Sequence, residues 1–420
     1  MKKLLFIFLT MASFSTFALD NSSSSTNEKI QATLDKIRIQ NNAPAMQVSV
    51  SLPGEYASRN FVSGTTEMNG KTNITTDSLF QIGSNTKAFV SVIILQLEAQ
   101  GKLSIDDPID KYIDFSKHPT WPSKWKNITI KQLLNMTSGI FSYTDDQNFS
   151  NEVINNPNIH FTATQLVNIA ASHPDDFSPG TSWNYSNTDY ILVGKIIQNL
   201  TGKTVTQLMY QKLLGSTQYN LDNTYYEGSQ DYSENINARA VGSYLNINGK
   251  IQDVSSKGLS WANAAGSMLS TGSDMTRWVR ALFSGPVLKP QQLNEMESLV
   301  CTDETPVLGC KLGQPVNNDG YGLGLYEKYD TNNNIGKVWL YEGQTFGTTS
   351  VYAYIPSYNT VIYVAGDYVN NERDYVGDLM NQILSILLQS HSWQKYRETH
   401  EMTPIDASQL NVTIIKFPKV

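Results

Sequence analysis

The spacing of hydrophobic residues predicts helices and strands near the beginning of the chain. Apolar residues recur with helical spacing from Ile30 to Ile39, whereas Met46 to Leu52 and Phe61 to Thr66 alternate like two paired strands. A second helical pattern runs from about Asn85 to Gln100 and stops at Gly101, a residue type that favours helix ends. We therefore expect an opening helix, a hairpin and then a buried helix.

Later in the chain, the pattern changes from helical to strand-like. The segment from about Ser104 to Leu259 shows little alternation but contains three helical patterns, at Ile130 to Met136, Ala163 to Ala171 and Tyr190 to Leu200. Alternation returns at Val338 to Leu340, Thr348 to Ile355 and Val361 to Asp367, and a last amphipathic helix follows from Val376 to Leu387. Strands at both ends with helices between them predict one sheet interrupted by a helical insertion.

These patterns divide the chain into an α/β domain, an insertion and an appendage. We place the discontinuous α/β domain at 28–105 and 255–389, the helical insertion at 106–254 and the C-terminal appendage at 390–420. In the appendage, the apolar residues between Val412 and Ile415 predict one added strand. Docking of this short patch on a membrane is the alternative.

The first 18 residues have the features of a removable secretory signal. Lys2 and Lys3 precede an apolar run from Leu4 through Phe17, and small residues lie at the expected cleavage site. A retained membrane anchor is the alternative, but the run is shorter than the ~20 residues that a spanning helix needs. We expect cleavage after residue 18, a flexible polar spacer at 19–27, and an exported protein, periplasmic or secreted, with no stable membrane span.

Composition narrows the possible partners and cofactors. The chain has 31 basic and 38 acidic residues and no basic stripe, which argues against nucleic-acid binding. Cys301 and Cys310 are the only cysteines, and an oxidising compartment would join them in a disulfide. The five histidines lack metal-site spacing, and no glycine pattern of a dinucleotide or phosphate site is present, so we expect neither a metal nor a cofactor.

The first candidate catalytic residues lie in the segment from Gly83 to Lys87. Residues three apart share one face of a helix, so the Lys87 amine can reach the Ser84 hydroxyl. A lysine activates a serine only when burial or positive neighbours lower the pKa of its amine. The Ser-x-x-Lys pattern also occurs at Ser123 to Lys126, and Ser84 taken by itself would be interpreted as an ordinary helix N-cap.

A second candidate element is Tyr185-Ser186-Asn187. A tyrosine whose phenolate is stabilised by lysine ammonium groups can act as a general base, and Asn187 can donate to a substrate amide oxygen. The Tyr-x-Asn spacing also occurs at 244–246 and 368–370. Without its context, Tyr185 would be interpreted as a surface aromatic residue.

Both elements, with their flanks, resemble the serine β-lactamase and penicillin-binding protein superfamily, in the branch of class C β-lactamases, D-alanyl-D-alanine carboxypeptidases and related esterases. The resemblance spans about Ile30 to Leu388. It rests on the segments 79–87, 106–112, 133–140, 179–190, 264–271 and 321–324, in this order. It implies an α+β fold, an antiparallel sheet flanked by helices with an inserted all-helical domain, and a site between the two parts.

The resemblance also implies roles for the four candidate residues. Ser84 would be the nucleophile and Lys87 its proton partner. Tyr185 would be the general base, and Asn187 would orient the substrate. The route of the proton between the lysine and the tyrosine is left open at this point.

The third motif of the superfamily departs from its usual pattern here. Members place Lys or His, any residue and then Gly on a strand facing the serine, whereas this chain has Tyr341-Glu342-Gly343-Gln344. Because side chains alternate along a strand, Tyr341 and Gly343 would face the cleft. Gly343 would leave room for a substrate strand, and the Gln344 amide would help to form an oxyanion hole.

The alternative for Tyr341 is a buried core tyrosine beside a turn. A tyrosine in this place removes the cation that would hold a substrate carboxylate, which should weaken such substrates by about ten-fold. If they are nevertheless bound well, another cation such as Arg239 or Lys257 must hold them.

These observations predict an exported serine hydrolase that works through an acyl-Ser84 intermediate. The foremost activity is that of a D-alanyl-D-alanine carboxypeptidase on peptidoglycan-type peptides, with an esterase or a weak class C-like β-lactamase as alternatives. From a different class, a non-catalytic penicillin- or peptide-binding protein would use the same cleft. In each case the partner is a D-alanyl peptide, an ester or a β-lactam.

Overall fold

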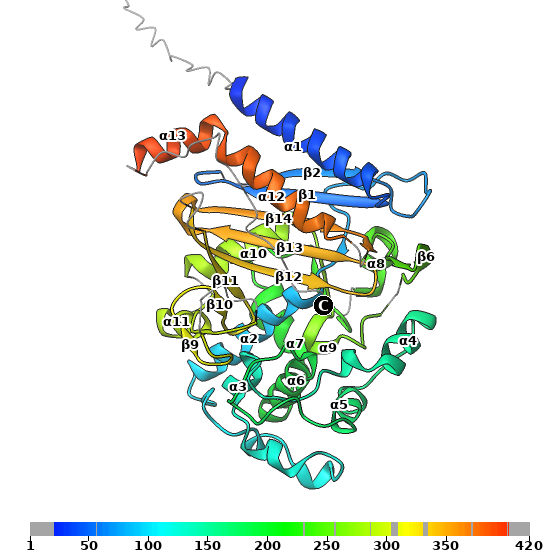
Figure 1. The fold of residues 1–420 in the computed structure, drawn as a ribbon, viewed down its shortest axis with the longest axis vertical. Coiled ribbons are helices and arrows are strands. Elements are labelled where there is room, and N and C mark those ends of the chain that lie inside the picture. Colours follow the sequence, from blue (N-terminus) through cyan, green and yellow to red (C-terminus); the bar gives the residue numbers. More distant parts are fainter. Residues whose placement is uncertain are drawn as a thin grey trace, which may run out of the picture.

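Strands from both ends of the chain form one antiparallel sheet of nine strands (Figure 1), in the order β2-β1-β14-β13-β12-β11-β10-β8-β9. The structure, a computed structural model, describes residues 21–55, 57–229, 232–255, 258–285, 287–303, 310–330, 335–370, 373–400 and 402. The sheet therefore joins the predicted N-terminal hairpin to the predicted C-terminal strands.

The longer strands of this sheet lie where alternation was predicted, whereas the short strands β8 to β11 were not predicted. The hairpin consists of β1 (Ala45–Ser51) and β2 (Arg59–Gly64). The centre consists of β12 (Gly336–Gln344), β13 (Thr349–Ile355) and β14 (Thr360–Gly366). Shorter strands complete the far edge: β8 (Leu299–Val300), β9 (Pro315–Val316), β10 (Gly320–Tyr321) and β11 (Tyr326–Asp330).

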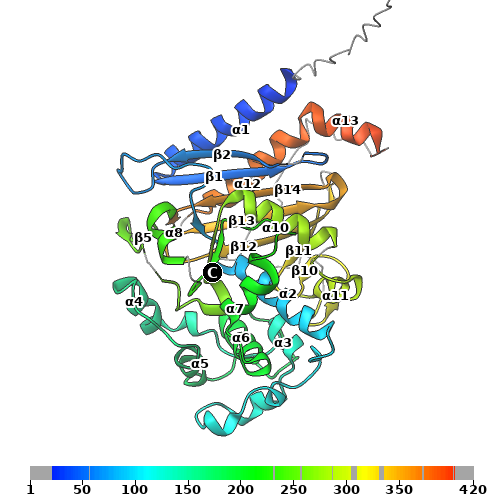
Figure 2. The ribbon, with the colours of Figure 1, turned by 180° about the vertical axis from the view of Figure 1, so that it is seen from behind.

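Helices cover both faces of the sheet. Helices α1 (Asn21–Gln40) and α12 (Tyr375–Leu388) pack against each other on one face. Helix α10 (Gly272–Ser284) packs against β1, β13 and β14 from the other face, which Figure 2 shows from behind. The apolar residues of α12 recur every three or four positions, so one side of the helix is buried against the strands.

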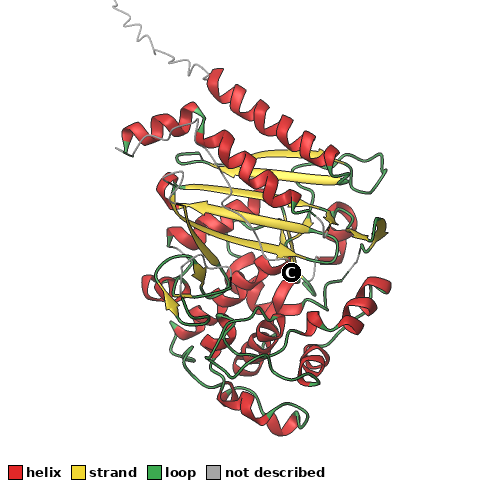
Figure 3. Ribbon diagram, in the orientation of Figure 1, coloured by secondary structure: helices red, strands yellow, loops and turns green. Residues whose placement is uncertain are grey.

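A mainly helical part lies below the sheet (Figure 3), and α2 (Thr86–Glu98) lies between the two. All ten residues of α2 from Thr86 to Leu95 are buried, so this helix forms the centre of the molecule. The lower part contains α3 (Ile130–Leu134), α4 (Gln147–Asn155), α5 (Ala163–Ala171), α6 (Asn187–Thr201) and α7 (Val205–Met209).

The remaining elements connect the two parts through two small sheets. One has the order β3-β7-β4, with β3 (Phe80–Gln81), β7 (Met268–Ser270) and β4 (Thr224–Tyr226). The other has the order β15-β5-β6, with β15 (Tyr368–Asn370), β5 (Tyr244–Ile247) and β6 (Lys250–Asp253). The other helices are α8 (Tyr232–Arg239), α9 (Asn263–Gly266), α11 (Pro290–Met296) and α13 (His391–Thr399).

The structure corrects two expectations about these segments. The polar run from Asn21 to Asn27, predicted as a flexible spacer, forms the first turns of α1, because it continues the helix that packs on α12. The inserted segment 106–254 is helical to Leu214 but then contains β4, β5 and β6. These strands have only three or four residues each, which is too short for a clear alternating pattern.

Other predictions concern the chain ends and the cysteines. Cys301 and Cys310 form the expected disulfide. The appendage begins with α13, which packs against α12, whereas the strand predicted at Val412 to Ile415 and the signal at 1–18 lie outside the described residues. Among the described helices, none combines the length and the apolar character needed to cross a bilayer.

Candidate active site

Ser84 lies on a 3-10 turn, Gly83–Asn85, that leads directly into α2. It thus precedes the helix, whereas the sequence placed it in the first helical turn. The residue at the helix N-cap is Asn85, and its side chain makes no capping bond; its Nδ2 instead donates to the Ile82 carbonyl at 3.0 Å and to Ser350 Oγ at 2.8 Å. The cap interpretation of Ser84 is therefore wrong, and its hydroxyl has other partners.

The Lys87 amine lies beside the Ser84 hydroxyl and is completely buried. Its Nζ is 2.9 Å from Ser84 Oγ, 2.7 Å from Asn187 Oδ1 and 2.9 Å from the Ala265 carbonyl oxygen. Burial lowers the pKa of Lys87 well below its usual value, although the Asp189 carboxyl acts in the opposite direction. Burial also raises the pKa of Asp189 well above its usual range, which favours its uncharged form.

Tyr185 completes the group around the serine. Its hydroxyl donates to Ser84 Oγ at 2.7 Å, and the Lys87 amine lies 4.9 Å from the centre of its ring. Burial raises the pKa of Tyr185 to about 12, while hydrogen bonds to Ser84 and Tyr341 act against this rise. Near neutral pH, Tyr185 is therefore a phenol rather than the phenolate that a resting general base requires.

Asn187 begins α6 and is fixed from three directions. Its Oδ1 accepts from Lys87, its Nδ2 donates to Thr144 Oγ1 at 3.0 Å, and its backbone N–H donates to Ser142 Oγ at 3.1 Å. The side chain also lines the cavity in front of Ser84. The structure thus brings together Ser84, Lys87, Tyr185 and Asn187, which are more than 100 positions apart along the chain at their extremes.

The competing copies of both motifs are structural. Lys126 points its amine over the ring of Phe115, at 5.9 Å from the ring centre, rather than at Ser123. The Tyr244 hydroxyl accepts from the Met68 backbone N–H at 2.9 Å. The Tyr368 hydroxyl accepts from Asn246 Nδ2 at 3.0 Å.

The third motif lies beside the serine, but in a different way from the prediction. Tyr341 is only 1% exposed, and its hydroxyl lies 3.3 Å from the hydroxyl of Tyr185 instead of in the cavity. A Cβ atom on Gly343 would lie 1.8 Å from the Ile82 carbonyl oxygen. Gly343 therefore makes room for the turn that carries Ser84, and not for a substrate strand, which corrects that expectation.

Of the two alternative cations, Arg239 does not supply the missing charge. Arg239 donates to Asn223 Oδ1 at 2.7 Å and to the Tyr225 hydroxyl at 2.8 Å, away from the cavity. Lys257 lies outside the described residues.

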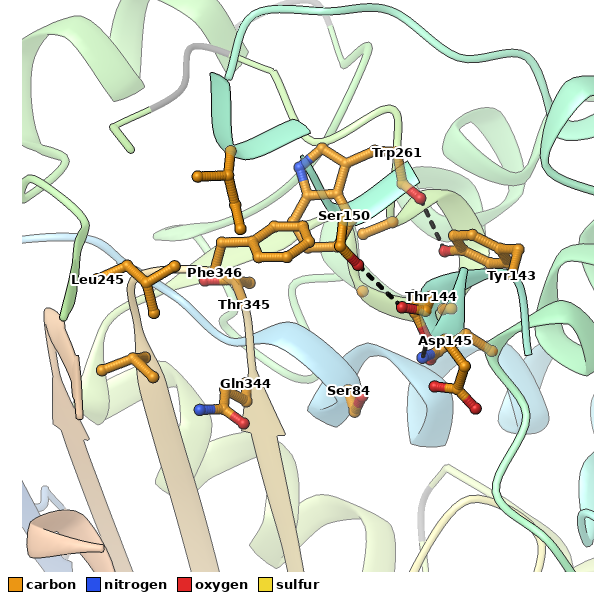
Figure 4. Close-up of a pocket in the computed structure, with 16 residues that line it drawn as sticks. Ser84, Tyr143, Thr144, Asp145, Ser150, Leu245, Trp261, Gln344, Thr345 and Phe346 are labelled. Carbon is orange, nitrogen blue, oxygen red and sulfur yellow. Dashed lines mark hydrogen bonds between the residues drawn. The ribbon is translucent and has the colours of Figure 1, made fainter. Parts of the chain in front are cut away.

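A cavity of about 240 Å³ opens in front of Ser84 (Figure 4). Gln344 and Asp145 lie on opposite sides of the serine in this view, and the rings of Trp261 and Phe346 lie together on one wall. These two rings are 4.8 Å apart between their centres. Further apolar side chains complete the wall, namely Ile154, Leu245 and Val369.

Asp145 is the one ionisable carboxyl in the described lining, which contains no Lys, Arg or His. It belongs to the 3-10 turn Tyr143–Asp145, held in place because the Tyr143 hydroxyl donates to the Trp261 carbonyl oxygen at 2.7 Å. Partial desolvation at the cavity, with a smaller contribution from Asp176, raises the pKa of Asp145 to about 6. Its side chain remains exposed to solvent at the same time, so it can meet a ligand.

Sequence reasoning missed several residues of this site. No local pattern identifies Asp145, Trp261 or Phe346, because each reaches the cavity through tertiary folding. Tyr321 and the Ala265 carbonyl lie in segments that carry the family resemblance, but their roles follow only from their contacts with Tyr341 and Lys87.

Comparisons with known proteins give a family and several relatives. A family model described as Beta-lactamase matches residues 28–384. The protein flp of Staphylococcus aureus (strain COL) is 27% identical over 256 residues, which are 60% of this chain and 46% of the relative. Penicillin-binding protein 4* of Bacillus subtilis (strain 168) is 34% identical over 142 residues, 33% of this chain and 29% of the relative. The chain thus spans less than half the length of these curated relatives.

Solved structures share the fold over most of both chains. A D-stereospecific amidohydrolase from Streptomyces sp. is 27% identical with a TM-score of 0.66, covering 81% of this chain and 94% of the other. A D-amino acid amidase from Ochrobactrum anthropi SV3 is 24% identical with a TM-score of 0.71, covering 86% of this chain and 98% of the other.

Proposed function

Because this chain belongs to the Beta-lactamase family and is a serine hydrolase, we propose that it hydrolyses amide and ester bonds of small D-amino acid derivatives through an acyl-Ser84 intermediate. The observation that carries this choice is the described lining of the cavity, whose only charged group is the acidic Asp145. A carboxylate there favours a substrate with a free, protonated amino group.

The contacts of Lys87 are compatible with this amine as the base. As an ammonium, Lys87 would donate to all three neighbours. As a neutral amine, it has two N–H groups for Asn187 Oδ1 and the Ala265 carbonyl, which only accept, and a lone pair for the Ser84 hydroxyl. The lowered pKa of Lys87 supports the neutral form.

The acylation step then balances with three proton transfers. Ser84 Oγ bonds to the substrate carbonyl carbon while its proton moves to Lys87. The bond to the leaving group breaks while Tyr185 gives its proton to the leaving nitrogen or oxygen, and Lys87 returns a proton to Tyr185. The backbone N–H groups of Ser84 and Gln344, both at the cavity, would stabilise the oxyanion. Water reverses these transfers during deacylation.

The apolar wall supports a bulky apolar side chain on the acyl part of the substrate. Trp261 and Phe346 offer two aromatic faces, and burying a phenyl or isobutyl group against them contributes roughly 1.5 to 3 kcal/mol to binding. Support for the D configuration comes from the Streptomyces amidohydrolase, which is described as D-stereospecific and is 27% identical.

A D-alanyl-D-alanine carboxypeptidase or a β-lactamase remains the second candidate, as family membership favours it. Both kinds of substrate carry a carboxylate, however, and this lining would repel it. An exported, periplasmic or secreted location is supported by the disulfide between Cys301 and Cys310 and by the apolar run at 4–17.

A substrate panel tests the proposal. We would compare kcat/KM for D-phenylalanine amide, its L enantiomer, N-acetyl-D-phenylalanine amide, an acylated D-Ala-D-Ala peptide and a chromogenic cephalosporin. We expect the free D-amide to be the best substrate by at least about ten-fold. A preference for the D-Ala-D-Ala peptide or the cephalosporin would overturn the proposal in favour of the second candidate.

A further inference from the structure

Two buried tyrosines continue the hydrogen-bonded chain behind Tyr185. The Tyr341 hydroxyl lies 3.3 Å from that of Tyr185, and the Tyr321 hydroxyl lies 2.9 Å from that of Tyr341. Tyr341 and Tyr321 are 1% and 0% exposed, and neither lines the cavity. Their hydroxyls therefore reach the reaction only through Tyr185.

The number of available donors fixes the direction of the hydrogen bonds among the three tyrosines. Each phenol has one O–H, and Tyr185 uses its own to donate to Ser84 Oγ. Its oxygen can then only accept from Tyr341, and the Tyr341 oxygen in turn accepts from Tyr321. All three bonds therefore point toward Ser84, and hydrogen bonds aligned in this way polarise and strengthen one another.

We propose that Tyr341 and Tyr321 are positioning residues that prepare Tyr185 to donate its proton to the leaving group, in the place where other members of the superfamily carry a cation. This proposal rests on the proposed function of the same site. When Tyr185 loses its proton, the O–H of Tyr341 stabilises the phenolate, and the O–H of Tyr321 stabilises Tyr341 in the same sense. No further proton is consumed, since Lys87 restores the phenol.

The surroundings of Tyr185 explain why its phenolate needs to be stabilised. The titratable groups that act on Tyr185 come from several elements, namely Lys87 on α2, Tyr143 near the cavity, Tyr190 on α6, Tyr321 on β10, and Tyr341 and Glu342 on β12. Burial and Glu342 both disfavour a negative charge on Tyr185, whereas the hydrogen bond from Tyr341 lowers the pKa of its phenol. Lys87 is the single cation among these described groups.

The dependence of the rate on the leaving group tests the proposal. We would measure kcat/KM, which reports acylation, for the anilide and the p-nitrophenyl ester of one D-phenylalanyl group. The anilide nitrogen must be protonated before it leaves, whereas nitrophenolate leaves without a proton. For Tyr341→Phe, we expect a loss of about ten-fold or more on the anilide and less than about three-fold on the ester. Tyr321→Phe should show a smaller change of the same kind.

Tyr352→Phe is the matched control. Tyr352 lies directly opposite Tyr341 on the neighbouring strand and is equally buried, but its hydroxyl has no hydrogen-bond partner among the described residues. We expect the control to keep the wild-type ratio of the two rates. If Tyr341→Phe does not fold, as judged by its melting temperature, Tyr321→Phe and its ratio decide the question.

The outcomes separate this proposal from the proposed function. Equal losses on both substrates, or no loss, in an active enzyme would overturn the role of the two tyrosines alone. A wild-type protein that cleaves neither substrate would overturn the proposed function and this role with it.

Discussion

The carbonyl oxygen of Ile82 occupies the space that a side chain at Gly343 would fill. Strand β12 and the turn of the nucleophile thus meet through their backbones. A second glycine, Gly83, makes the same contact from the other side, because a Cβ atom there would lie 2.7 Å from the Gln344 nitrogen. The position of Ser84 relative to Gln344 depends on these two glycines.

We therefore expect Gly343→Ala to displace the turn from β12. The crowding should lower the free energy of unfolding by about 1 to 3 kcal/mol and kcat/KM by about 100-fold. Gly202→Ala is a control, since Gly202 has a positive φ (+67°) that disfavours alanine but has no atom within 4 Å of an added Cβ. It should lose stability without losing activity. Urea unfolding and steady-state kinetics measure both effects, and full activity of Gly343→Ala would contradict the contact.

Covalent labelling should identify Ser84 as the nucleophile. A fluorophosphonate should modify Ser84, because it is the only serine in the described part of the chain that contacts both Lys87 and Tyr185. Mass spectrometry of the digested protein locates the adduct. Ser84→Ala should remain unlabelled, whereas Ser123→Ala should be labelled like the wild type; an adduct at another serine would refute the mechanism.

For a substrate without a free amino group, such as N-acetyl-D-phenylalanine amide, the pH dependence of kcat/KM should have a single limb. Activity requires neutral Lys87 and protonated Tyr185, so it should rise with pH through the lowered pKa of Lys87. It should not fall again below about pH 11, because burial raises the pKa of Tyr185 to about 12. Lys87→Arg, which stays cationic, should lose about two to four decades of kcat. A decline of activity between pH 7 and pH 9 would contradict these assignments.

Replacing Asp145 by asparagine should discriminate between charged and neutral substrates. We expect Asp145→Asn to lower kcat/KM for D-phenylalanine amide by about ten-fold and to leave its N-acetyl derivative unaffected. In the wild type, the ratio of the two rates should rise as the pH passes about 6, where Asp145 becomes charged, and should fall above about 8, where the substrate amine loses its proton. A ratio independent of pH and of the substitution would exclude contact between Asp145 and the amine.

The apolar wall should control the preference for side chains. Phe346→Ala should reduce kcat/KM for D-phenylalanine amide by about ten-fold relative to D-alanine amide, because it removes an aromatic face of the wall. Phe283→Ala is a comparison variant, since Phe283 stacks on Trp339 and Tyr354 at the sheet and not in the cavity. A loss that is equal for both amides would argue against a side-chain pocket.

Local patterns identified the elements that carry the chemistry. The three-residue spacing of Ser84 and Lys87 survives the change from a helical turn to a 3-10 turn, because both geometries place these residues on one side. The helices at Ala163 to Ala171 and around Tyr190 were also predicted, since their apolar stripes are long enough to show a period.

The roles of other site residues depend on tertiary contacts, which local sequence patterns do not record. The link between Tyr341 on β12 and Tyr321 on β10 depends on side chains from two strands on either side of β11 coming together near Tyr185, which no spacing in the chain records. The role of Gly343 depends on the backbone of Ile82, a partner without a side-chain signal. Asp145 was missed because a single acidic residue in a polar loop has no pattern.

The pairing of β1 with β14 has a consequence for how the protein folds during synthesis. The Ala45 backbone N–H donates to Asp367 Oδ1 at 2.7 Å, although 322 residues separate them. At about 5 to 20 residues per second, a ribosome leaves β1 without its partner strand for tens of seconds. The seven buried residues of β1 are exposed during this time, so slow, chaperone-dependent folding is the expected cost of joining both ends of the chain in one sheet.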